Sequence, residues 1–205
     1  RIKKSNMPTF TTKWTMCQDD VDLVSAAGQW NSWSLEVDGT GNYVTWMQQR
    51  VWQEINISLV DGYGAYVSED TNLTEGTQVN AISNYPIVIG GCYSWTGNNL
   101  VKDVSGSDCD PDTIMITNNS TKPWIFGLTK QNPQTKVHMP ICADMVLQKQ
   151  PVCYTPLLAV FAKVGRQYKT SSIITDIGSW ARLDIKTKES DFVFNRDVTQ
   201  WVPDL

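Results

Sequence analysis

The side chains that could do chemistry are few, and the most suggestive of them form an acidic run near the middle of the chain. Asp108, Asp110 and Asp112 alternate there, with Asp103 just upstream. Carboxylates this close repel one another, and a calcium ion, which prefers flexible oxygen ligands, would relieve the repulsion. The Gly and the distal Glu of an EF-hand loop do not follow, and aspartate is common in turns. The run therefore favours solvated turn residues, with calcium bound at Asp108, Asp110 and Asp112 as the alternative.

His138 is the only histidine, so any Ser-His-Asp or Cys-His arrangement would have to be built on it. Its neighbours Val137, Met139 and Pro140 are typical of a loop that leads into a strand. The chain has no Gly-x-x-x-x-Gly-Lys-Ser/Thr motif and no Gly-x-Gly-x-x-Gly that opens a helix. Two of the 21 acidic residues could still meet in space as a glycosidase pair, but nothing in their order favours it. We expect no enzymatic activity, and a hydrolase is the alternative.

The cysteines argue against zinc and leave their redox state open. Their number is odd, they include no Cys-x-x-Cys pair, and no histidine lies near them in sequence; they are Cys17, Cys92, Cys109, Cys142 and Cys153. Cys92–Cys109 and Cys142–Cys153 could each close a loop. Reduced, buried cysteines are the expected state if the protein is made inside a cell.

Nine tryptophans in 205 residues are unusual. Aromatic cores and buried interfaces are the favoured explanation, because tryptophan carries much area per residue. Exposed tryptophans that stack on sugars or nucleobases are the alternative. Four asparagines lie in Asn-x-Ser/Thr sequences, a weak indication of secretion: Asn56, Asn72, Asn118 and Asn119.

Composition bounds the class of protein. The length suits one all-β domain over residues 1–205, and the apolar fraction of 41% is enough for a core. A net charge of −4 disfavours a broad basic surface for nucleic acid, although scattered Arg and aromatic residues could bind single strands locally. No apolar run reaches the roughly 18 residues of a membrane span, and no signal peptide is visible. Because the chain begins at Arg1 without Met, we expect a fragment or a mature product.

Alternating apolar residues predict the strands that must position these side chains. Ala181, Leu183 and Ile185 alternate with charged residues, while Leu157–Val164 is apolar except for Lys163, as in a strand covered on both faces. Further strands are expected at 9–16, 30–37, 53–60, 77–89, 113–117, 124–129, 141–147 and 191–194, and Pro86 indicates an edge strand, a bulge or a kink. A short helix is expected at 20–27, with Asp20 as its cap. Residues 44–51 could be a short helix or the lead-in to a strand. Residues 66–76 and 90–111 are expected to be loops. The pattern predicts an antiparallel jelly-roll sandwich of about eight strands.

The residues near the C-terminus resemble the end of the capsid protein of parvoviruses, particularly the small capsid proteins of arthropod densoviruses. Pro156, Lys163 and Val164 match a strand of that family, and Trp180 with Leu183, Ile185 and Lys186 matches the alternating strand after it. Trp52–Val60 is similar to an early strand of the family. The chain is much shorter than most parvovirus capsid proteins and lacks their Gly-rich and phospholipase segments. Circovirus-type capsid proteins are comparably compact.

The resemblance implies a non-enzymatic jelly roll that associates with copies of itself in an icosahedral virion around a single-stranded DNA genome, assembled inside the host cell. It also implies a loop around the fivefold axis, for which Gly90–Pro111 is the candidate, with Gly90, Gly91, Trp95, Asn98 and Asn99 as its candidate residues and the aspartates near a pore. Nucleic-acid-binding residues and a host receptor are not indicated. The alternative is a secreted or surface β-sandwich glycoprotein that binds carbohydrate.

Overall fold

The computed structural model describes residues 9–60, 62–81, 83–103 and 109–204. Strands make up 52% of the chain, so the mostly-β class is confirmed. The helical elements are α1 (Gln18–Ala26) and a 3-10 turn, η1 (Ile177–Ser179). Within the described ranges, no helix has the length and apolar character needed to cross a membrane.

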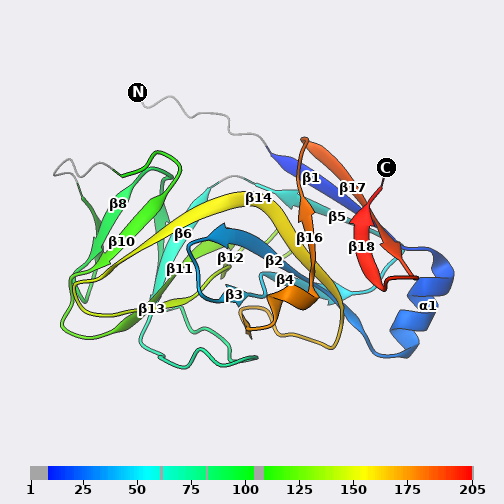
Figure 1. The fold of residues 1–205 in the computed structure, drawn as a ribbon, viewed down its shortest axis with the longest axis horizontal. Coiled ribbons are helices and arrows are strands. Elements are labelled where there is room, and N and C mark those ends of the chain that lie inside the picture. Colours follow the sequence, from blue (N-terminus) through cyan, green and yellow to red (C-terminus); the bar gives the residue numbers. More distant parts are fainter. Residues whose placement is uncertain (1–8, 61, 82, 104–108, 205) are drawn as a thin grey trace.

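The largest sheet has seven strands and contains both predicted C-terminal strands. Its order is β4 (Met47–Arg50), β2 (Trp30–Asp38), β14 (Pro151–Gly165), β10 (Ile114–Asn118), β8 (Cys92–Trp95) and β9 (Leu100–Lys102), with β16 (Ala181–Asp184) also on β14. β14 and β16 pair antiparallel, with Ala159 opposite Asp184, as two adjoining strands should. In Figure 1, β14 arches from the β8–β10 end of the molecule toward the end that carries α1.

Three smaller sheets complete the fold. One has the order β18 (Gln200–Pro203), β17 (Glu189–Asn195), β1 (Phe10–Thr15) and β5 (Glu54–Leu59). Another has the order β12 (His138–Pro140), β11 (Trp124–Gln131), β6 (Tyr63–Ser68) and β7 (Ser83–Ile87), with β13 (Asp144–Val146) on β11. The last pairs β15 (Ile173–Ile174) with β3 (Tyr43–Val44). Because β1–β17 and β8–β10 are parallel pairs, the four-stranded and seven-stranded sheets are mixed, and a purely antiparallel arrangement is the wrong prediction.

Tryptophan fills the core, and this accounts for most of its abundance. Trp14 is fully buried, with ring centroids 5.6 Å from Trp33 and 5.2 Å from Trp201. Seven of the nine tryptophans are buried, whereas Trp30 is half-buried and Trp52 is 61% exposed. The core explanation is therefore confirmed, and these seven side chains are not left over for contact with other molecules.

Local structure in the N-terminal half departs from the predictions in two places, at the start of the helix and at the expected loop 66–76. The helix begins at Gln18, and Asp20 lies inside it, where its carboxylate pairs with Arg196 at 2.5 Å instead of capping. The expected loop 66–76 is wrong at its start, because Tyr66 is fully buried in β6 and donates to the carbonyl of Cys142 at 2.7 Å. Of the three interpretations of Pro86, the edge strand is confirmed, since β7 lies at a sheet edge and pairs with β6 in the described part of the chain.

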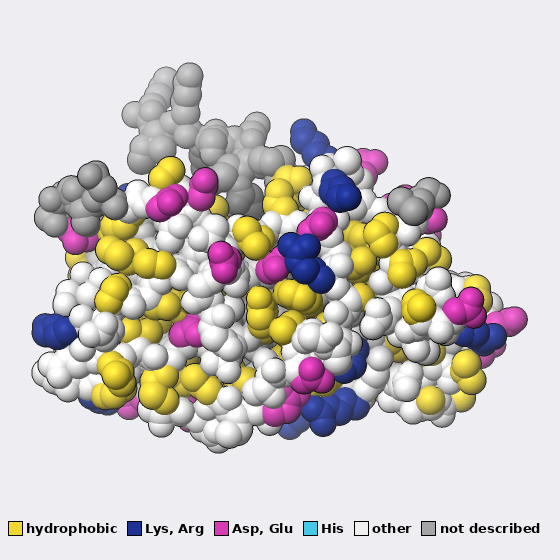
Figure 2. Space-filling view, viewed as in Figure 1, with side chains coloured by type: hydrophobic (Ala, Val, Ile, Leu, Met, Phe, Trp, Pro, Cys, Tyr) yellow, Lys and Arg dark blue, Asp and Glu magenta, His cyan; other side chains and the backbone are white. Residues whose placement is uncertain are grey.

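Charge is distributed without a dominant basic area on the face seen in Figure 2. Lys and Arg side chains alternate there with Asp and Glu, and apolar side chains lie between them. This agrees with the expectation, from net charge, that no broad basic surface is present on this face.

Candidate functional site: an apolar groove where three sheets meet

The candidate site begins at an irregularity in β14. Pro156 lies opposite Val37 of β2 and Val160 lies opposite Leu35, so β14 advances four residues while β2 advances two. Such an insertion is a β-bulge, which bends the strand and turns its side chains in new directions. The bulge therefore separates an upstream half of β14 from a downstream half.

The bulge coincides with a change of neighbour on the other edge of β14. Residues 151–154 pair with β10, whereas residues 159–162 pair with β16. Leu157 and Leu158, between these two ladders, are 37% and 51% exposed. The carbonyl of Leu158 accepts the Ile185 N–H at 2.8 Å, which holds the bulge against the segment after β16. Two leucines are thus fixed in position with their side chains open to solvent.

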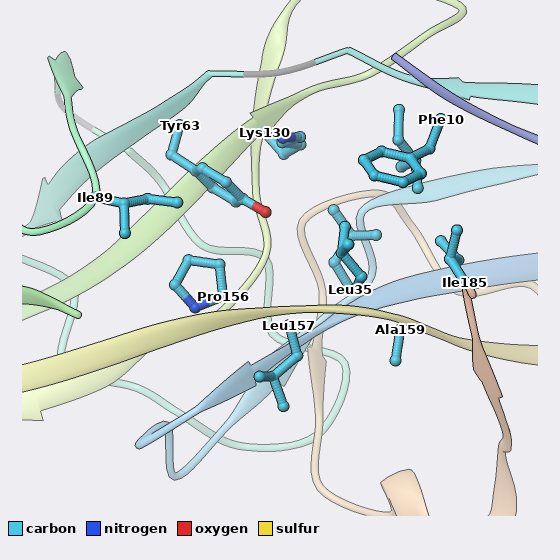
Figure 3. Close-up of a pocket in the computed structure, with 11 residues that line it drawn as sticks. Phe10, Leu35, Tyr63, Ile89, Lys130, Pro156, Leu157, Ala159 and Ile185 are labelled. Carbon is cyan, nitrogen blue, oxygen red and sulfur yellow. The ribbon is translucent and has the colours of Figure 1, made fainter. Parts of the chain in front are cut away.

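These leucines border a groove of about 220 Å³ at the junction of the three larger sheets (Figure 3). The four-stranded sheet contributes Phe10 and Leu59, and the five-stranded sheet of β6 and β11 contributes Tyr63 and Lys130. The rest of the lining is apolar and comes from β2, the β7–β8 connection, β14 and the segment after β16: Leu35, Ile89, Pro156, Leu157, Leu158, Ala159 and Ile185. Figure 3 shows Phe10 and Ile185 on one side of the groove and Tyr63 and Ile89 on the other. Its chemistry suits an apolar side chain.

Lys130 gives the groove its charged element. The side chain is only 5% exposed, and its Nζ lies 3.8 Å from the centroid of the Tyr63 ring. A cation over an aromatic face is attracted by the negative face of the ring, which offsets part of the cost of burying the charge. The pKa of His138, on neighbouring β12, is lowered by burial and secondly by the charge of Lys130.

The acidic run does not form a metal centre in the part of the chain that the structure describes. Asp110 and Asp112 are exposed, and the Asp112 N–H donates to Oδ1 of Asp110 at 3.0 Å, which is a local turn. No group of three potential metal ligands occurs among the described residues. Asp108 lies outside those residues, so calcium binding at this run stays a prediction.

The segment Gly90–Pro111 is not the unpatterned loop that was expected, because it contains β8 and β9. Trp95 is buried, with its ring centroid 5.1 Å from that of Trp124. Gly90 has a φ of 79° and precedes Gly91 at the base of the hairpin, and Asn98 and Asn99 lie exposed in its turn. Trp95 is therefore a core residue, whereas the two asparagines are accessible at the β8–β10 end of the molecule (Figure 1).

The cysteines divide into one pair and three free thiols. A disulfide joins Cys92 to Cys109, with 6.0 Å between the Cα atoms. Cys142 is buried and free, while Cys17 and Cys153 are free and exposed. The loop closure Cys92–Cys109 is therefore confirmed, whereas Cys142–Cys153 does not form. The expectation of reduced, buried cysteines is right for Cys142, but Cys17 and Cys153 are free and exposed.

His138 does not assemble a catalytic triad with its described neighbours. Its Nδ1 lies 3.2 Å from the hydroxyl of Thr129, which donates to Oδ1 of Asn84 at 2.6 Å. Neither partner is a carboxylate that could orient an imidazole as a general base. Of the four Asn-x-Ser/Thr sequences, three have an exposed asparagine that a glycan could reach, Asn56, Asn72 and Asn119, whereas Asn118 is fully buried.

Most groove residues could not be predicted from the sequence. The apolar run Leu157–Val164 is a strand, as predicted, but hydropathy alone cannot show that its first two leucines are exposed. Phe10, Tyr63 and Lys130 come from segments far apart in the chain, and no motif connects them. Pro156, at the start of the bulge, is the one residue of the pattern that indicates an interruption.

Comparison with family models, curated proteins and solved structures finds no match to this chain.

Proposed function

We propose that this chain is a structural protein that associates with copies of itself, a jelly-roll capsid protein of a small virus that encloses single-stranded DNA. The resemblance to parvovirus capsid proteins motivates the proposal. The residues that carry it lie on or beside adjacent antiparallel strands, with Pro156, Lys163 and Val164 on β14 and Leu183 on β16. The mostly-β class is consistent with such a protein.

The observation that carries the proposal is the groove at the β14 bulge. Leu157, Leu158 and Ile89 are 37–51% exposed around it, and Val88 beside Ile89 is 51% exposed. Apolar side chains held open on a rigid strand are costly in an isolated protein and are typical of interaction surfaces. A shell made from one kind of chain includes contacts between unlike surface patches, in which the groove of one copy can receive apolar side chains of the next.

The particle mass of the purified protein tests the proposal. We expect large, uniform particles by mass photometry and negative-stain electron microscopy, with nucleic acid detected by the ratio of absorbance at the nucleic-acid and protein maxima. A protein that stays monomeric over the accessible concentration range, without nucleic acid, would contradict the function.

A pair of charge substitutions tests the role of the groove. Leu158→Glu places a carboxylate at the proposed contact and should prevent assembly, because an unpaired charge is costly to bury. Leu23→Glu is the matched control, since Leu23 is 58% exposed on α1, away from the groove. Both variants should fold, as surface substitutions usually change stability by less than about 0.5 kcal/mol. If Leu158→Glu still assembles, the groove is not the contact, whatever the function.

A further inference from the structure

A second concave surface lies between α1 and the β4 edge of the seven-stranded sheet. It is a cleft of about 450 Å³, lined by Val21 and Ser25 of α1, by Trp30 of β2, by Arg50 at the end of β4, and by Val51 and Trp52 just after it. This volume is within the range of small-molecule sites. In Figure 1, α1 lies at the opposite end of the molecule from strands β8 and β10.

Strand register brings the aromatic and cationic side chains of the cleft together. Trp30 and Arg50 are direct partners across β2 and β4, and Cζ of Arg50 lies 5.7 Å from the Trp30 ring centroid. Val51 is 5% exposed and packs in the core. Arg50 and Trp52, on either side of Val51 in the chain, are both exposed to solvent. Trp52 is 61% exposed, the most exposed of the nine tryptophans.

Arg50 differs from the other described arginines in its electrostatic surroundings. Arg166, Arg182 and Arg196 each form an ion pair with a carboxylate at 2.8 Å or less. Arg50 forms none within the described ranges, and its guanidinium lies against the Trp30 ring. A guanidinium held on an aromatic face, with its donors unused, is suited to a planar carboxylate.

We propose that this cleft binds a pyranose sugar that carries a carboxylate, such as a uronic acid at the end of a glycan. The exposed ring of Trp52 stacks on the apolar face of the sugar, and Arg50 receives the carboxylate in a bidentate contact. A nucleic-acid strand fits less well. Its phosphates would pass α1, which has the exposed carboxylate of Asp19 in its first turn and no basic residue in its last.

Saturation-transfer difference NMR tests the proposal, because it detects weak ligands on a monomer and on a particle alike. The probes are methyl glucuronide, methyl glucoside and an oligothymidylate. We expect the glucuronide to bind about tenfold more tightly than the glucoside, since a hydrogen-bonded charge contributes at least that factor. Equal affinity for the two sugars, no saturation transfer at millimolar concentration, or tighter binding of the oligothymidylate would each overturn the proposal.

Substitutions separate the two contacts. Trp52→Ala should abolish binding of both sugars, whereas Arg50→Gln should bring the glucuronide down to the affinity of the glucoside. Arg50→Lys, which retains the charge without the fork of donors, should fall between Arg50→Gln and the unsubstituted protein. Arg166→Gln is the matched control, because Arg166 also lies on an aromatic ring, that of Tyr168 at 4.8 Å, but is paired with Glu75. A loss of binding in Arg166→Gln as large as in Arg50→Gln would contradict the assignment.

Discussion

Asn118, the last residue of β10, offers a sharp test of how the strands beside the hairpin are held. It is fully buried, and its Nδ2 donates to the carbonyls of Lys122 and Val146, both at 2.9 Å. Its Oδ1 accepts the Ser120 N–H at 3.1 Å and the Ser120 hydroxyl at 2.6 Å. All the hydrogen-bonding groups of this amide are therefore satisfied, and they join β10 to the following turn and to β13.

Removing the amide should cost a large part of the stability of the protein. Each hydrogen bond contributes about 1 kcal/mol, so loss of the four in Asn118→Ala predicts about 4 kcal/mol of destabilisation. The free energy of unfolding of such domains is about 5–15 kcal/mol, so the variant should be marginally stable.

Asn118→Asp changes the charge and keeps the shape, and its effect should depend on pH. The introduced carboxyl retains both contacts with Ser120 but replaces the donor with an oxygen 2.9 Å from two carbonyl oxygens. Burial and these carbonyls disfavour the ionised form and raise the pKa of the introduced group in the folded state. A raised folded pKa contributes stability that is present below the unfolded value, about 3.9, and is lost as the pH rises through the folded value. The stability difference from the unsubstituted protein should therefore grow as pH rises.

Denaturant unfolding at about pH 4 and about pH 7 measures this difference, each variant being compared with the unsubstituted protein at the same pH. Asn118→Ala should show the same loss at both values. Asn119→Asp is the matched control: the neighbouring side chain is exposed, so its loss should stay within about 0.5 kcal/mol. The reasoning is refuted if Asn118→Asp costs no more than Asn119→Asp, or costs the same at both pH values.

Three further predictions concern single residues. The pKa of His138, measured by NMR, should lie below 6.5, because burial and the charge of Lys130 lower it. The neutral imidazole then contributes stability that is lost as the pH falls through the folded pKa. A measured pKa at or above 6.5 would contradict this prediction. Gly39→Ala should destabilise the protein by about 3 kcal/mol or more in denaturant unfolding, because Gly39 has a φ of 86° and an added Cβ would overlap a β14 carbonyl. Gly28→Ala is the control and should cost only about 1 kcal/mol, because Gly28 has a φ of 66° but nothing would contact its Cβ. Cys142 should resist alkylation until the protein unfolds, because burial raises its pKa, while two other thiols react in the native state; three thiols labelled natively would show otherwise.

The elements that could be predicted from sequence are those whose own pattern decides them. β5 and β16 alternate apolar and polar residues, so both their type and their buried face follow from the chain. β8 was missed because four residues between glycines and a Gly-Asn-Asn turn carry too short a pattern. The parallel pairing of β1 with β17 joins Thr11 to Glu189, and no local pattern encodes a partner so distant in sequence.

The two candidate binding surfaces depend on register, and this is why sequence reasoning could not place them. Leu157 and Leu158 belong to the same apolar run as Ala159 and Val160, yet the first two are exposed and the last two are buried. What separates them is the bulge against β2, a property of the pairing and not of either strand alone. The cleft at α1 has the same origin, because Trp30 and Arg50 meet only through the β2–β4 register. Hydropathy therefore identifies the strands from which a contact surface is built, and strand pairing decides which of their side chains remain available for contact.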